Sequence, residues 1–341
     1  MNSDSPTRTV PGRQLGAALT LVLTLLGVLG GAAARAAGCG AVCLPLEALD
    51  PQNAQVNGQQ LRLSLVGQYA DFDQYRQGTD SLPNPANASA TIWQVTGVAD
   101  YGITPRWTAS LLVPYVHKHQ QNKKFGDRTA RGLGDVALFG RYAALTPVKL
   151  TDPSLSVGLG IKFPTGSTDQ PGDAPDLPPA MQTGSGAYDA VPTVAYFQRL
   201  GGYSLYGSAL YRIPLEANDR GYRFGRELDL HFGTVVPLAA TAQRVALLAS
   251  LDYTHAQRDT DNHMILPAKV RDGTTVLNTG GRFLDFTPGV RVHLDRRLAL
   301  QLRVSIPVYQ YWNGDRSRGV GQVAQRFTTQ LSLIYTASHR F

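Results

Sequence analysis

The stretch FTTQLSLIYTASHRF, residues 327–341, decides the fold. Every second residue, from Phe327 to Phe341, belongs to a set that is mostly apolar or aromatic. The intervening set is nearly all polar and comprises Thr328, Gln330, Ser332, Ile334, Thr336, Ser338 and Arg340. Strict alternation is typical of a β-strand that has one face in water and the other against an apolar phase.

The same alternation recurs along the chain and predicts twelve strands in all. Trp107, Leu111 and Tyr115, for example, lie on the apolar face of one of them. A length of about ten residues suits a tilted strand that crosses a bilayer. One span, 188–199, is ambiguous because Pro192 stands in its middle. The expected strands are 61–70, 91–102, 106–116, 134–145, 154–163, 188–199, 203–213, 226–236, 244–254, 282–293, 297–309 and 327–341.

The connections between these strands alternate between long and short. The long ones are 71–90, 117–133, 164–187, 214–225, 255–281 and 310–326. The short ones are 103–105, 146–153, 200–202, 237–243 and 294–296. Outer-membrane barrels have long extracellular loops and short periplasmic turns. We therefore predict an all-β fold over 61–341: an antiparallel up-and-down transmembrane β-barrel of about 12 strands in the bacterial outer membrane.

The overall composition excludes two other classes of protein. The chain is 43% hydrophobic and 17% charged, with a mean hydropathy of −0.15, which is too polar for a helical membrane protein. A barrel alternates polar and apolar residues, so its average conceals its preference for a membrane. The net charge of +7 is spread without a run of Lys or Arg, so no nucleic-acid partner is expected.

The first residues predict export. Residues 1–36 have a basic start, an apolar run and the small-residue pattern of a cleaved secretory signal peptide, although a retained helix is the alternative. Residues 37–60 are expected to form a periplasmic tail. Its Cys39 and Cys43 are expected to form a disulfide, because exported proteins meet an oxidising compartment. Lipidation of Cys39 and metal capture are weaker alternatives, since structural zinc requires four ligands.

Four short motifs carry a resemblance to a known family. They are GLGDVALFGRY at 132–142, GLGIKFPTG at 158–166, QTGSGAYD at 182–189 and GYRFG at 221–225. In this order they resemble the outer-membrane transporter family associated with the meta-pathway of phenol degradation, over roughly residues 60–341. The resemblance implies a channel for small, often aromatic, solutes.

The last strand carries a second resemblance. It is similar to the closing strand of bacterial outer-membrane barrels, whose terminal Phe is read by the barrel-assembly machinery. Phe341 would then be the assembly signal, whereas His339 departs from the pattern because an aromatic ring is more usual there. The expected partners are that machinery, outer-membrane lipid and a small-molecule solute.

Strand parity also predicts which residues line the lumen. Twelve strands give a bore between filled eight-stranded barrels and open porins, so we expect a narrow, charge-lined conduit. Arg291 and Arg303 on neighbouring strands could form a positive stripe that favours anionic solutes, or could belong to a paired structural network. Asp100 has inward parity, and the predicted lining residues are Arg62, Arg141, Lys162, Arg212, Glu227, Asp229, His231, Asp252, Asp285, Arg291 and Arg303.

Two alternative functions remain open at this point. His255, Asp259, Asp261 and His263 lie together in the loop THAQRDTDNH, 254–263, where an outer-membrane protease or lipase could draw on an Asp–His pair. A structural or adhesive barrel is the other alternative. The sequence has no nucleophile elbow, zinc-protease motif or phosphate-binding loop, so we expect no enzyme, no cofactor and no metal.

Overall fold

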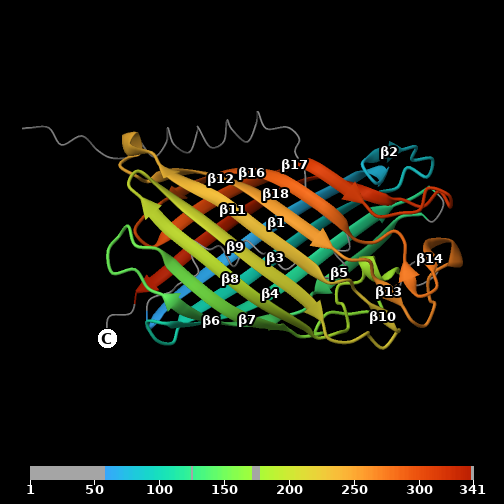
Figure 1. The fold of residues 1–341 in the computed structure, drawn as a ribbon, viewed down its shortest axis with the longest axis horizontal. Coiled ribbons are helices and arrows are strands. Elements are labelled where there is room, and N and C mark those ends of the chain that lie inside the picture. Colours follow the sequence, from blue (N-terminus) through green and yellow to red (C-terminus); the bar gives the residue numbers. More distant parts are fainter. Residues whose placement is uncertain (1–57, 124–125, 171–176, 339–341) are drawn as a thin grey trace, which may run out of the picture. The chain divides into compact units, whose positions relative to one another are not determined.

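The computed structural model describes residues 58–123, 126–170 and 177–338. The expected signal peptide, Cys39, Cys43 and Phe341 lie outside these ranges. Twelve long antiparallel strands form the wall in the described residues (Figure 1). They are β1 (Gln60–Gln77), β3 (Ser89–Gly102), β4 (Trp107–Gln121), β6 (Ala137–Leu145), β7 (Ser154–Lys162), β8 (Asp189–Leu200), β9 (Tyr203–Pro214), β11 (Glu227–Pro237), β12 (Val245–Ala256), β16 (Gly281–His293), β17 (Leu298–Trp312) and β18 (Gln322–Ser338).

The sheet closes on itself between its first and last strands. β1 pairs with β18 from Gln60 opposite Ser338 to Arg76 opposite Gln322. Every other long strand pairs with its neighbours along the chain, so the topology is up-and-down. A closed sheet leaves no unpaired edge, which is why such a barrel can cross a bilayer. The predicted fold class is confirmed.

Pro192 does not interrupt its strand. It lies in β8 opposite Leu159 of β7, and its own side chain is exposed. On the other side of β8, the ladder to β9 runs from Ala190–Ile213 directly to Thr193–Leu210. Proline has no N–H to donate, so the ladder is broken where Pro192 stands.

The short strands gather at the loop end of the barrel (Figure 1). β2 (Asp80–Leu82) extends the β1 hairpin, and β5 (Arg128–Leu133) continues the wall above β6 by pairing with β4. A separate four-stranded sheet, the extracellular cap, is formed by β10 (Tyr222–Arg223), β13 (Thr260–Asp261), β15 (Thr275–Val276) and β14 (Arg271–Asp272). Three 3-10 turns are η3 (Pro179–Met181), η4 (Ala239–Thr241) and η5 (Ala268–Val270).

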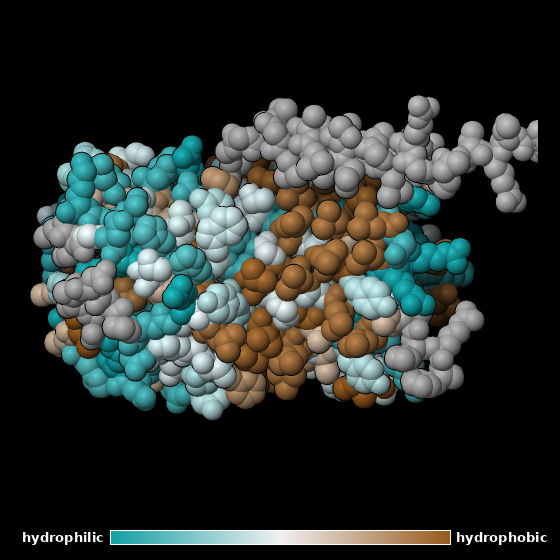
Figure 2. Space-filling model, turned by 180° about the vertical axis from the view of Figure 1, so that it is seen from behind, coloured by the Kyte–Doolittle hydropathy of each residue, from teal (hydrophilic) through white to brown (hydrophobic). Residues whose placement is uncertain are grey.

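The outer face of the wall carries an apolar band. Figure 2 shows hydrophobic side chains over the strands, with hydrophilic residues at both ends. Leu65, Leu159 and Phe232 are each more than half exposed, which a wall facing water would not tolerate in such numbers. The band suits contact with lipid, and the chain is an outer-membrane β-barrel. Among the described residues, no helix has the length and apolarity to cross a bilayer.

The lumen wall carries an apolar cluster on β1, β3, β4, β6, β8 and β9, which strand parity had not predicted. Leu112 is 1% exposed although both its neighbours, Leu111 and Val113, face lipid. Phe139 is fully buried, and a Cβ on Gly160 of the adjacent strand would lie 2.3 Å from its ring, so glycine makes room for it. We call this cluster the apolar collar: Val66, Val98, Leu112, Ala137, Phe139, Val191 and Leu210.

Candidate functional site

The periplasmic side of the collar holds a first charged cluster, the lower patch. Asp100 accepts hydrogen bonds from Nε and an Nη of Arg62, at 3.1 and 2.8 Å. Its other oxygen accepts from Arg141 at 2.8 Å and from the Ser110 hydroxyl at 2.5 Å. Arg62, Asp100 and Ser110 stand opposite one another on β1, β3 and β4. Buried charges require such pairing, because an unpaired one costs several kcal/mol.

The extracellular side of the collar holds a second cluster, the upper patch. Lys162, whose side chain is fully buried, contacts Asp135 at 2.9 Å and Asp189 at 3.1 Å. Its ammonium also donates to the Ser185 hydroxyl. Arg212 then continues the network, lying 3.5 Å from Asp189. Three of the four motifs that carry the family resemblance supply Asp135, Lys162, Ser185 and Asp189, so the fold brings separate motifs to one place.

The described residues of the loop between β7 and β8, 163–170 and 177–188, fold toward the interior above the upper patch. The Lys118 ammonium donates to the main-chain oxygens of Ala180 and Gln182, at 3.0 and 2.8 Å. Leu177 and Thr183 are fully buried. These contacts tie residues 177–188 to the wall at a buried lysine.

Two glycines allow the two arms of this loop to meet. A Cβ on Gly184 would lie 2.2 Å from the main-chain oxygen of Gly166, which is too close for any side chain. The Gly166 N–H donates to Asp135 at 2.9 Å, and the Ser185 N–H does so at the same distance. The loop is thus fastened to the upper patch through its backbone.

A third network lies on the opposite wall. Asp252 is 2.8 Å from Nδ1 of His231 and accepts from the hydroxyls of Ser250 and Thr287. Arg303 donates to Ser250 at 2.6 Å. These side chains belong to β11, β12, β16 and β17, so one polar cluster spans four strands.

Arg291 lies nearer the periplasmic end of this wall. Its Nε donates to the Gln301 side chain at 2.8 Å, and Gln301 is the cross-strand neighbour of Arg291. Asp285 lies nearer the extracellular end, opposite Asp252 of the third network, so two carboxylates share that part of the wall with Arg303. Both signs of charge therefore occur together here, as they do in the other two networks.

The predicted lining residues all lie on the inward parity of their strands. Glu227, His231 and Arg291 are half-buried, and Thr254 donates to the buried Asp229. The others are buried: Arg62, Arg141, Lys162, Arg212, Asp229, Asp252, Asp285 and Arg303.

Three charged residues of the networks were missed as lining residues. Asp135 and Asp189 stand inside the quoted motifs. The available signal was Lys162, an inward-facing lysine on the strand between them that requires acidic partners. Lys118 lies beyond residue 116, where its strand was predicted to end, whereas β4 continues to Gln121.

The two carboxylates of the Asp–His loop are bonded within the cap. Asp259 accepts from the Tyr222 hydroxyl at 2.6 Å and from the Gly225 N–H at 2.7 Å, and its burial raises the pKa of its carboxyl to about 6. Asp261 accepts from the N–H groups of Ile265 and Leu266. These carboxylates hold the extracellular cap together. In the described part of the chain, no three His, Cys, Asp or Glu side chains are grouped so as to hold a metal ion.

Comparison with known proteins identifies the family. Residues 74–281, more than half of the chain, match the family described as "Putative MetA-pathway of phenol degradation". The chain belongs to this family. No curated protein matches it.

Similar folds occur among solved structures. An outer-membrane channel from Pseudomonas putida F1 superposes with a TM-score of 0.61 at 12% identity, covering 83% of this chain and 97% of that one. The translocator domain of the autotransporter NalP from Neisseria meningitidis has a TM-score of 0.43 at 12% identity, over 87% and 94% of the two chains. The CymD monoaromatic hydrocarbon channel has a TM-score of 0.42 at 10% identity, over 91% and 95%.

Proposed function

We propose that this outer-membrane barrel is a channel that passes small solutes through its lumen. The observation that carries the proposal is the layered interior, in which an apolar collar on one half of the wall lies between two charge-paired patches. A purely structural barrel has no need to place ionic groups on both sides of an apolar collar, because their burial costs free energy.

The layered lumen suits small solutes that combine an apolar ring with a polar or anionic group. The ring can pass along the collar at Leu112 and Phe139, while the half-buried His231 and Arg291 of the opposite wall present polar and cationic side chains. The family's link to phenol degradation agrees with such cargo. The described residues of the loop between β7 and β8 fold toward the interior, so the proposed cargo is small.

The proposed role is passage, not catalysis. The two acidic groups that a hydrolase would draw on, Asp259 and Asp261, are committed to bonds within the cap. We also propose that residues 1–36 direct export, that the barrel-assembly machinery inserts the strands, and that the tail with Cys39 and Cys43 stays in the periplasm.

Solute uptake by liposomes containing the purified protein tests the proposal. We expect entry of benzoate and phenol above that of empty liposomes, and single-channel conductance in planar bilayers. Phe139→Ala should raise both, because it widens the collar, whereas the adjacent lipid-facing Leu138→Ala should leave them unchanged.

The channel would be overturned if protein with normal heat-modifiable migration gave sealed bilayers and no uptake. An adhesive or structural barrel would then remain. Equal effects of the two alanine variants would show that passage does not depend on the collar.

A further inference from the structure

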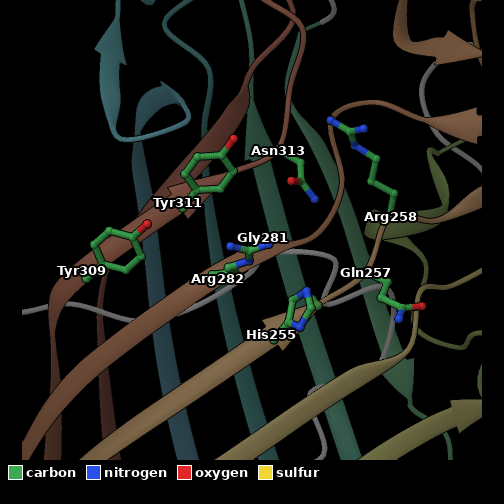
Figure 3. A pocket seen from close by; sticks show the side chains of 9 residues that line it. His255, Gln257, Arg258, Gly281, Arg282, Tyr309, Tyr311 and Asn313 are labelled. Atoms are coloured by element: carbon green, nitrogen blue, oxygen red, sulfur yellow. The ribbon is translucent and has the colours of Figure 1, made fainter.

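A pocket of about 630 Å³ opens at the extracellular end of β12, β16 and β17. His255, Arg282 and Tyr311 lie side by side on these three strands, as the register and Figure 3 both show. Tyr309 lines the same pocket from β17, and Arg258 reaches it from the loop that follows β12.

This pocket faces away from the lumen. Arg282 stands between Gly281 and Phe283, which are buried, and is itself exposed. Tyr309 and Tyr311 are 44% and 41% exposed, whereas Gln310 between them is buried. Strand faces alternate, so these side chains point outward at the extracellular rim.

The chemistry of the pocket is cationic. Two arginines and a histidine line it, and none of its described lining residues is Asp or Glu. Arg258 makes one long contact, 3.3 Å from an Nη to the main-chain oxygen of Gly314. A guanidinium offers a planar fork of donors that matches the oxygens of a phosphate.

The wall directly below the pocket is apolar. Leu251, Phe286 and Ile306 are cross-strand neighbours on the same three strands, each more than a third exposed. Tyr309 lies on β17 between this apolar row and the level of Arg282, and Tyr311 is level with Arg282. Aromatic residues take this position at the boundary between hydrocarbon and head groups.

We propose that this pocket binds the phosphorylated head group of a lipid of the outer leaflet. Arg258 and Arg282 hold the phosphate, the tyrosines stack on the head group, and the acyl chains lie along Leu251, Phe286 and Ile306. The inference rests on the location of the barrel in the outer membrane and is independent of what passes through the lumen.

Titration of the detergent-solubilised full chain with bisphosphorylated lipid A, followed by native mass spectrometry, tests the proposal. We expect Arg258→Gln combined with Arg282→Gln to raise the Kd about tenfold or more, because each arginine supplies charge-assisted hydrogen bonds to the phosphate. Arg282→Lys keeps the charge but loses the planar fork of donors, so its Kd should lie between those of the wild type and the double variant.

The matched control is Arg296→Gln combined with Arg297→Gln, which removes the same charge from the exposed turn at the opposite end of the barrel. An equal loss of affinity for lipid A in this control would overturn the site and leave only a general attraction between basic side chains and an anionic lipid. Binding of inorganic phosphate as tight as that of lipid A would overturn the assignment to a lipid. Conductance, which depends on the lumen, should be unchanged in all these variants, so failure of the channel would not affect this test.

Discussion

The two charged patches of the lumen are built in different ways. In the lower patch, Arg62, Asp100 and Arg141 come from neighbouring strands and meet because the sheet's register sets them opposite one another. In the upper patch, Lys162 and Asp135 also bind a loop through the backbone of Gly166 and Ser185. The lower patch is therefore a feature of the wall, whereas the upper one couples the wall to the entrance.

Removing the cation of the upper patch is expected to have the largest effect. Lys162→Met leaves Asp135 and Asp189 buried without their shared ammonium, which costs about 3 to 5 kcal/mol of stability. The loop 163–188 should then detach, so that conductance rises while the urea midpoint falls.

Lys149→Met, in an exposed turn, is the matched control and should change neither quantity. A Lys162→Met barrel with normal conductance and normal protease resistance of the loop would show that this patch does not couple to the entrance.

The lower patch should respond differently to a change of similar chemistry. Asp100→Asn keeps an oxygen for hydrogen bonding but leaves Arg62 and Arg141 without this carboxylate. We expect a loss of about 1.5 to 3 kcal/mol and a stronger preference for anions, with the loop still protected from protease. Reversal potentials in a salt gradient measure this preference. A loop released by Asp100→Asn would erase the distinction between the patches.

The opposite wall tests whether paired charges can still select solutes. Arg291→Gln combined with Arg303→Gln should lower the preference for anions, most visibly at low salt, where charges are least screened. Thermal stability should fall less than in Lys162→Met, because Gln keeps a hydrogen-bond donor at both positions. Unchanged selectivity with lowered stability would instead mark these arginines as parts of a structural network.

The strands of the wall could be predicted from the sequence, whereas the paths of the loops could not, for a physical reason. Strand faces alternate with a period of two, so the inward position of Arg62 and Arg141 follows from their lipid-facing neighbours. The path of 163–188 depends on Lys118 meeting two main-chain oxygens, which no local pattern encodes.

The ends of the strands could not be predicted from the alternation either. β1 continues to Gln77 across a bulge at Asp71 and Phe72, where the alternation fails. The apolar collar was missed because inward positions were expected to be polar, although Leu112 and Phe139 have the correct parity.

The smallest expected effect is confined to the cap, where a carboxylate is held by neutral donors instead of arginines. Asp259 accepts from Tyr222 and Gly225, and its burial raises its pKa from 3.8 to about 6. The folded cap thus binds more protons than the unfolded chain between these values. The stability of the cap should be greatest below pH 3.8 and should fall as the pH rises through about 6.

Hydrogen exchange of 222–225 and 259–276, corrected for intrinsic rates, follows this loss of cap stability. Asp259→Asn cannot titrate, so protection of the cap should become independent of pH, at the cost of one acceptor for Tyr222 or Gly225. The exposed Asp272→Asn in the same cap is the control and should keep the wild-type slope. If the protection of the cap still fell with pH in Asp259→Asn, the pH dependence would belong to another group. It would also remove the contrast with Asp100, which is paired with two arginines.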